Sequence, residues 1–212
     1  MLASNRQGLG RNSMAHSLGL FPGTFNPPTR AHVELARAAL AMVDRVAWIL
    51  PREFPHKGYE GVDFTGRLRM VQAAIAGEPG FFARSAESGL FIDIARDFRE
   101  SHGSDTRLVM LCGRDAAERI VNWDYGHSEA FPRMLDEFEM LVASRGGRYE
   151  PPAELRHRIH SLDFALDEIS ATDIRDRIAR GESWEFLVAE GVEALVRELY
   201  GSGAQRTVPR GT

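Results

Sequence analysis

A histidine that follows a turn rich in glycine and proline could bind phosphate in this chain. The turn is Gly23-Thr24-Phe25-Asn26-Pro27-Pro28, and a helix that contains His32 is expected to begin near Thr29. Gly23 allows the backbone to approach a ligand and tolerates positive φ, while the two prolines lack N–H groups, so the remaining amides of the turn can point at an anion. The helix dipole and the His32 ring favour the same anion. The alternative is an ordinary strand–turn–helix connection with a solvated histidine.

A second helix start with similar chemistry lies much later in the chain, at Ser170-Ala171-Thr172-Asp173-Ile174-Arg175. Ser170 followed by Asp173 forms a capping-box pattern, which predicts that a helix begins here. The amides of its first turn, the Thr172 hydroxyl and the Arg175 guanidinium could together bind a second anion. The alternative is a capped amphipathic helix that binds nothing.

The two stretches together resemble the signature of the nucleotidyltransferase superfamily, which is a G-T-F-[DN]-P turn followed by [HT]-x-G-H, with a later I-S-[ST]-x-x-R motif. This chain has Gly23-Thr24-Phe25-Asn26-Pro27, then Thr29-Arg30-Ala31-His32, and later residues 169–175. Ala31 stands where the family usually has glycine, and Ala171 stands within the second motif. The resemblance implies that the second motif binds the triphosphate of ATP from the side opposite His32.

Two further stretches resemble the bacterial nicotinate-nucleotide adenylyltransferases. Residues 51–57 with residues 67–70 are similar to their P-x-x-x-P-H-K and R-x-x-M pattern, and Gly113-Arg114-Asp115 with Trp123 is similar to their G-A-D and W. Lys57 could serve as a point charge for a phosphate, Asp115 could accept hydrogen bonds from a ribose, and Trp123 could stack on a pyridine ring. Packing in a core or an interface is the alternative for Trp123.

The resemblance implies adenylyl transfer from ATP to the phosphate of nicotinate mononucleotide in NAD biosynthesis, with release of pyrophosphate. Mg²⁺ would accompany ATP as its cofactor and bind phosphate oxygens and water, so that no protein metal ligands are expected. The residues implied for catalysis are His32, Thr29 and Arg175; those implied for ATP binding are Gly23, Thr24, Phe25, His32, Gly113, Asp115, Ser170, Thr172 and Arg175; and those implied for the acceptor are Lys57, Arg114 and Trp123.

The identity of the acceptor stays open at this level. Where the subfamily has S-Y-T-x-D-T-L in contact with the nicotinate, this chain has a different sequence at residues 87–94, and Pro22 before the turn is more similar to the pantetheine-phosphate adenylyltransferases. The alternatives are therefore nicotinamide mononucleotide or phosphopantetheine as acceptor, CTP as donor, or a regulatory module that binds nucleotide without turnover.

Composition narrows the classes of function. The chain has 212 residues, of which 43% are hydrophobic and 26% charged, with a formal net charge of -4, so it has no basic field for nucleic acid. The single Cys112 excludes an internal disulfide, and no apolar run approaches the roughly 20 residues of a membrane span. We expect a cytoplasmic enzyme whose partners are ATP and a small mononucleotide, with no nucleic acid or membrane partner and with the question of a homo-oligomer open.

The order of the expected elements predicts an α/β fold. Strands and helices alternate, and residues 45–50 and 107–112 are continuous apolar runs, which are typical of strands buried on both faces of a parallel sheet. We therefore expect a doubly wound parallel sheet, the Rossmann-like nucleotidyltransferase fold, in one domain over residues 18–200, with a disordered extension at 1–17 and a flexible tail at 201–212. The strands are expected at 18–21, 45–50, 81–84, 107–112, 139–143 and 160–166, and the helices at 29–43, 64–75, 90–100, 116–120, 130–138, 170–180 and 192–200.

In such a sheet the carboxyl ends of the strands meet at one edge, where ligands bind. The turn at residues 23–29, the loop after Leu50, Gly113-Arg114-Asp115 and the segment at Ser170 would all lie along this edge. The sequence therefore predicts one site built from both halves of the chain.

Overall fold

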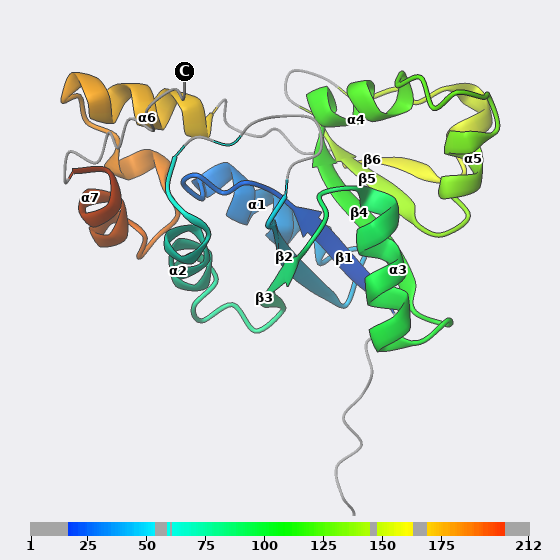
Figure 1. Ribbon diagram of the computed structural model, residues 1–212, viewed down its shortest axis with the longest axis horizontal. Helices are drawn as coiled ribbons and strands as arrows, with labels where there is room; N and C mark the ends of the chain where they lie inside the picture. The colour runs from blue at the N-terminus through cyan, green and yellow to red at the C-terminus, as the bar shows by residue number, and fades with distance from the viewer. Residues whose placement is uncertain (1–16, 54–58, 60, 145–147, 163–168, 202–212) are drawn as a thin grey trace, which may run out of the picture.

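The computed structural model describes residues 17–53, 59, 61–144, 148–162 and 169–201 (Figure 1). In these ranges six parallel strands form one sheet in the order β3-β2-β1-β4-β5-β6. The chain adds strands on one side of β1 and then crosses to add the others on the opposite side, which confirms the doubly wound topology in one domain. The strands are β1 (Ser17–Pro22), β2 (Arg45–Pro51), β3 (Phe81–Ala86), β4 (Arg107–Gly113), β5 (Glu139–Ala143) and β6 (Ile159–Leu162).

Helices cover both faces of the sheet, and the strands supply apolar side chains to each face. Along β2, Trp48 and Leu50 point into one apolar cluster while Ala47 and Ile49 point into the other, as the alternation of a strand requires. Figure 1 shows α2, α6 and α7 on one side of the molecule and α3, α4 and α5 on the other. The helices are α1 (Arg30–Ala39), α2 (Phe64–Ala74), α3 (Phe91–His102), α4 (Arg114–Val121), α5 (Ala130–Met134), α6 (Ala171–Arg180) and α7 (Glu193–Gly201), with 3₁₀ turns η1 (Ala153–Leu155) and η2 (Glu185–Leu187).

Several boundaries differ from the expected ones for local reasons. Helix α1 ends at Ala39 rather than near residue 43, because the amides of Ala41 and Met42 bond to carbonyls three residues back and tighten the chain into turns. Helix α5 ends at Met134 rather than 138, and turns of the same kind follow it. Strand β3 extends to Ala86, two residues beyond the expected short strand.

The terminal predictions and part of the last strand fall largely outside the described residues. Ser17, which the expected extension included, is instead the first residue of β1, and its hydroxyl donates to the Asp44 carboxylate at 2.7 Å. Gly201, the first residue of the expected tail, is instead the last residue of α7. The rest of the extension, residues 202–212 of the tail and residues 163–166 of the expected last strand lie outside the described ranges. Within those ranges, no helix is long and apolar enough to span a bilayer.

Candidate active site

The turn between β1 and α1, residues 23–29, is organised around a buried aromatic ring, and we call it the cradle turn. Phe25 has φ 46° and its side chain is only 1% exposed, with ring centroids 5.4 Å from Phe21 and 4.9 Å from Trp48. A Cβ on Gly23 would lie 2.8 Å from the Phe25 ring. The positive φ that the sequence allowed for Gly23 is therefore at Phe25, and glycine is needed at position 23 because the ring lies directly against it.

The amides of the cradle turn are used unequally. The Gly23 N–H donates to the Ile49 carbonyl at 3.0 Å, so this amide belongs to the junction with β2 and is not directed at a ligand. In the described part of the chain, no acceptor receives a hydrogen bond from the amides of Thr24 and Phe25. The amide of Asn26 likewise donates no hydrogen bond in the described part of the chain, so these three amides are available to an anion.

Thr29 and His32 form a reciprocal cap at the start of α1. The Thr29 hydroxyl oxygen accepts from the His32 amide at 3.3 Å and lies 2.9 Å from His32 Nδ1, while the Thr29 amide donates to Nδ1 at 2.9 Å. Because Nδ1 acts as an acceptor here, a neutral His32 ring carries its proton on Nε2. The cap therefore orients His32 as an Nε2–H donor. Thr29 itself is 1% exposed, so it acts through His32 rather than by touching a ligand.

The second predicted helix start lies directly against the cradle turn. Ser170 is the N-cap of α6, and its hydroxyl oxygen accepts from the Thr172 amide at 3.1 Å. Arg175 donates from Nη2 to the Thr172 hydroxyl at 3.0 Å and from Nη1 to the Asn26 carbonyl at 2.8 Å. A hydrogen bond between residues 149 positions apart thus brings the first turn of α6 against the turn that precedes α1.

The segment between α6 and α7 also contacts the cradle turn, through hydrogen bonds that involve its main chain. Thr29 and Val188 form an antiparallel bridge, and the Ala189 amide donates to the Pro28 carbonyl at 3.2 Å. Arg30 Nη1 donates to the Phe186 carbonyl at 3.3 Å. The C-terminal part of the chain is therefore a structural component of the site.

Beneath the cradle turn lies a buried polar group that sequence reasoning did not assign to the site. Arg67 of α2 is 2% exposed, donates to the carbonyls of Thr24 at 3.2 Å and Pro51 at 3.4 Å, and lies 4.6 Å over the Tyr59 ring. Burial lowers the pKa of Arg67 and raises the pKa of Tyr59 to about 12. Tyr200 of α7 donates to Asn26 Oδ1. The R-x-x-M pattern was the only signal for Arg67, and no local pattern pointed to Tyr200.

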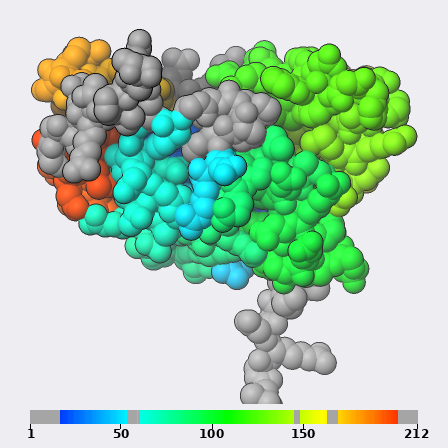
Figure 2. Space-filling model, viewed as in Figure 1, coloured from blue at the N-terminus to red at the C-terminus, as the bar shows by residue number. Residues whose placement is uncertain are grey.

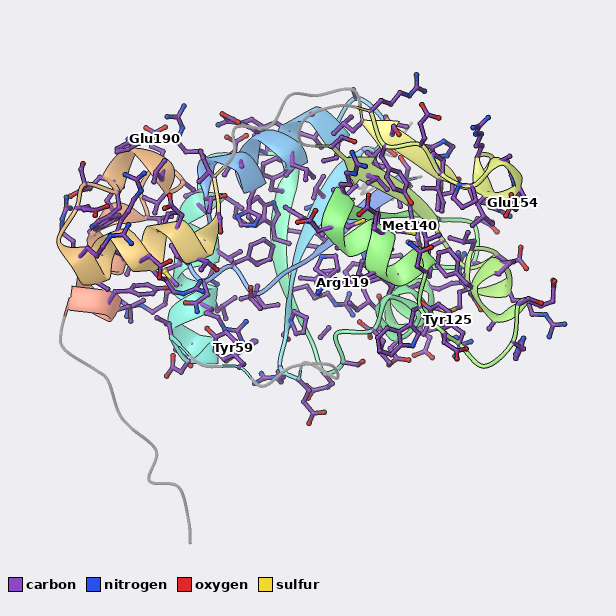
Figure 3. All side chains as sticks on the ribbon, turned by 90° about the horizontal axis from the view of Figure 1, so that it is seen from above. Tyr59, Arg119, Tyr125, Met140, Glu154 and Glu190 are labelled. Carbon is purple, nitrogen blue, oxygen red and sulfur yellow. The ribbon has the colours of Figure 1, made fainter. Side chains whose placement is uncertain are left out.

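The third cluster of predicted residues lies across the sheet at the start of α4. Gly113 is the N-cap of α4, and Asp115 and Trp123 share an open cavity of about 780 Å³, where the Trp123 side chain is 53% exposed. Arg114 is not among the residues that line this cavity, and its guanidinium pairs with Glu118 at 2.7 Å. In the view from above, Tyr59 lies on the α2 and α6 side and Arg119, which lines the cavity, lies on the α4 side (Figure 3).

The structure thus brings together most, but not all, of the predicted site. Figure 2 shows α6 and α7, in orange and red, at one end of the molecule and the green α3–α5 region at the other. His32, Thr29, Thr172 and Arg175 converge on the cradle turn, whereas Asp115 and Trp123 form a separate lining at α4. Lys57, predicted to bind a phosphate, lies outside the described residues.

This arrangement of a parallel sheet with two helix starts around one turn defines a nucleotidyltransferase. Residues 20–177 match the family model described as cytidylyltransferase-like. A "Probable nicotinate-nucleotide adenylyltransferase" of Exiguobacterium sibiricum is 33% identical over 190 residues, covering 85% of this chain and 96% of the relative. One of the same name from Gloeobacter violaceus is 33% identical, covering 88% and 97%. The chain therefore belongs to the nicotinate-nucleotide adenylyltransferase family, within the broader cytidylyltransferase-like family.

Solved structures share the fold at lower sequence identity. The nicotinic acid mononucleotide adenylyltransferase of Plasmodium falciparum "complexed with APC" matches with a TM-score of 0.66 at 15% identity, covering 87% of this chain and 97% of that chain. The structure of the same enzyme "complexed with NaAD" matches with a TM-score of 0.68, also at 15% identity and with coverage of 87% and 97%. These similarities agree with the expected Rossmann-like nucleotidyltransferase fold.

Proposed function

We propose that this chain transfers the AMP group of ATP to the phosphate of nicotinate mononucleotide and releases pyrophosphate, a step of NAD biosynthesis. The relatives that cover nearly its whole described length carry the name of this activity. The observation that carries the site assignment is the 2.8 Å hydrogen bond from Arg175 Nη1 to the Asn26 carbonyl. It brings a helix start with an arginine against the turn that orients His32, which is the geometry that a bound triphosphate needs.

In the proposed reaction, an oxygen of the acceptor phosphate forms a bond to the α-phosphorus of ATP. The bond from this phosphorus to the oxygen that bridges to the β-phosphate breaks, and pyrophosphate leaves with the electron pair. The attacking phosphate is already ionised at neutral pH, so the reaction requires no general base. The protein's task is to align the two substrates and to stabilise the charge that develops on the phosphorus and on the leaving group.

The residues at the cradle turn divide this task. His32 donates from Nε2 to an oxygen of the α- or β-phosphate, and Thr29 keeps the ring in that orientation through the cap. The amides of Thr24 and Phe25 point to the same phosphates. Arg175, held beside the turn, binds the β- and γ-phosphates with its remaining N–H groups.

The outer parts of the site bind the rest of the two substrates. Thr172 and the first turn of α6, capped by Ser170, complete the triphosphate site. At α4, Asp115 accepts hydrogen bonds from a ribose, and Trp123, whose indole is half exposed in the cavity, stacks on the pyridine ring of the acceptor.

Mg²⁺ enters the site as part of the MgATP substrate. Among the described residues no group of His, Cys, Asp and Glu side chains could hold a metal ion. Mg²⁺ usually keeps several water ligands and binds through substrate phosphates, so phosphate oxygens of ATP and water, and not protein side chains, would be its ligands here. Bound in this way, it neutralises part of the phosphate charge, while His32 and Arg175 act on the remaining oxygens.

The experiment that tests the proposal measures pyrophosphate release by the purified chain with MgATP and one acceptor at a time. We expect turnover with nicotinate mononucleotide, and at least tenfold lower kcat/KM with nicotinamide mononucleotide, with phosphopantetheine, or with CTP in place of ATP. A preference for another acceptor or donor would overturn the substrate assignment. Tight ATP binding with no pyrophosphate from any acceptor would instead identify a regulatory nucleotide-binding module. We also propose that the protein acts in the cytoplasm, which cell fractionation tests.

A further inference from the structure

One buried asparagine receives hydrogen bonds from two helices of the C-terminal part of the chain. Asn26 is 3% exposed, its side-chain oxygen accepts from the Tyr200 hydroxyl of α7, and its main-chain carbonyl accepts from Arg175 Nη1 of α6 at 2.8 Å. On the other side, a Cβ at Gly61 would lie 2.3 Å from Asn26 Nδ2. The Asn26 side chain is therefore enclosed on the side of Gly61 and hydrogen-bonded on the side of α7.

We propose that Tyr200 is a positioning residue for adenylyl transfer, because its hydroxyl holds Asn26 and thereby sets where Arg175 meets the triphosphate. The inference rests on the proposed function of the same site. Tyr200 does not touch the substrates in this arrangement. It acts through Asn26, which accepts hydrogen bonds from both Tyr200 and Arg175.

The Tyr200 hydroxyl stays protonated at physiological pH and can therefore serve as a constant hydrogen-bond donor. Burial raises the pKa of Tyr200 well above its usual value, and the nearby Tyr59 raises it further, whereas the charges of Arg175 and Arg67 act in the opposite direction. The hydroxyl therefore keeps its proton under physiological conditions and donates to Asn26 Oδ1. Removing this donor would leave a buried amide oxygen without its partner, and because an unsatisfied buried acceptor is destabilising, the Asn26 side chain would shift toward another donor.

Helix α7 has other attachments, so the hydroxyl of Tyr200 can be removed without releasing the helix. Arg69 of α2 pairs with Glu198 through two hydrogen bonds of 2.8 and 3.0 Å. Val196 is fully buried, and a Cβ at Gly66 of α2 would lie 3.2 Å from Leu199. A Tyr200→Phe variant keeps the ring and these contacts and loses only the hydrogen bond to Asn26.

The test compares Tyr200→Phe with Tyr125→Phe in the full chain. Tyr125 also has a raised pKa from burial and donates its hydroxyl to a main-chain carbonyl, that of Ile120 at 3.0 Å, but it lies in the α4–α5 region. We expect Tyr200→Phe to lower kcat/KM for ATP about tenfold, the effect of one lost buried hydrogen bond, with the KM of the acceptor unchanged. Tyr125→Phe should leave the KM for ATP unchanged, although it should lower the melting temperature about as much as Tyr200→Phe does, because each variant loses one hydroxyl hydrogen bond.

A double variant decides whether Tyr200 acts through Arg175. If it does, adding Tyr200→Phe to Arg175→Ala should change MgATP affinity by less than about twofold, because the residue being positioned is already absent. Wild-type ATP kinetics in Tyr200→Phe, or fully additive effects of the two substitutions, would overturn the inference.

The same variants remain informative if the proposed function fails. Calorimetric titration with MgATP alone measures the positioning effect without any turnover. Absence of pyrophosphate release by the wild-type chain would reject the proposed reaction, whereas equal MgATP affinity of the wild type and Tyr200→Phe would reject the role of Tyr200. The two failures are thus distinguished by separate measurements.

Discussion

Replacing His32 by asparagine should separate the structural role of its Nδ1 atom from the catalytic role proposed for its Nε2–H group. Asparagine places Oδ1 at the same number of bonds from Cβ as Nδ1, so it can still accept the Thr29 amide, which donates to Nδ1 at 2.9 Å in the native cap. It has no atom in the place of Nε2. Loss of a donor to transition-state charge lowers kcat by about 10²- to 10³-fold. We therefore expect His32→Asn to lose turnover by this factor while remaining about 1 kcal/mol more stable than His32→Ala, because both variants lose the ring contacts with Phe25 and Trp48 but only asparagine keeps the cap.

His32→Ala is the matched comparison, because it removes both nitrogens. Thr29 is 1% exposed, so its amide would lose its acceptor in a buried place, and we expect about 1–2 kcal/mol of destabilisation in addition to the lost turnover. Urea denaturation measures the first quantity and pyrophosphate release the second. Wild-type turnover in His32→Asn would refute the assignment of Nε2–H as the donor, and equal stability of both variants would refute the cap as the reason for the histidine's orientation.

Three further variants test other parts of the structure. Arg175→Ala should raise the KM for ATP about 10- to 100-fold in steady-state kinetics, and an unchanged KM would remove it from the phosphate site. Gly23→Ala should lower stability by about 1–3 kcal/mol in thermal unfolding, since its Cβ would lie 2.8 Å from the Phe25 ring, and a wild-type melting curve would contradict that packing. Glu139 has a lowered pKa, chiefly through the hydrogen bond from Arg107, so its carboxylate stabilises the fold above its unfolded pKa, and this contribution is lost as pH falls through the folded pKa. Glu139→Gln should thus cost about 1–2 kcal/mol at neutral pH and progressively less below about pH 4, whereas a pH-independent difference in urea unfolding would contradict the charge as its cause.

The parts of the fold that follow from local chemistry could be predicted from the sequence. The apolar runs at 45–50 and 107–112 identified β2 and β4, because strands buried on both faces have few polar residues. The helix starts expected near Thr29 and at Ser170 lie at the N-caps of α1 and α6, because a helix start depends on neighbours within one turn. The predicted ends of α1 and α5 were too late, because each helix is followed by turns with hydrogen bonds to carbonyls three residues back, which the apolar pattern did not reveal.

The contacts that assemble the site join residues distant in sequence, and no local sequence pattern predicts them. Arg175 was predicted as a phosphate ligand, yet its hydrogen bond to the Asn26 carbonyl follows only from the folded arrangement. Tyr200 belonged to an expected helix without any sign of its bond to Asn26. Phe25 was expected to offer its amide, and its ring turned out to be the buried centre of the cradle turn.

The main-chain pairing of the cradle turn with the segment before α7 has a consequence for biosynthesis. A ribosome that has translated the first four strands has already made His32 and the whole turn, but neither the Val188 bridge nor the Ala189 amide that donates to Pro28 exists yet. At that stage the nascent polypeptide therefore contains the cradle turn without the main-chain partners that pair with it in the folded chain.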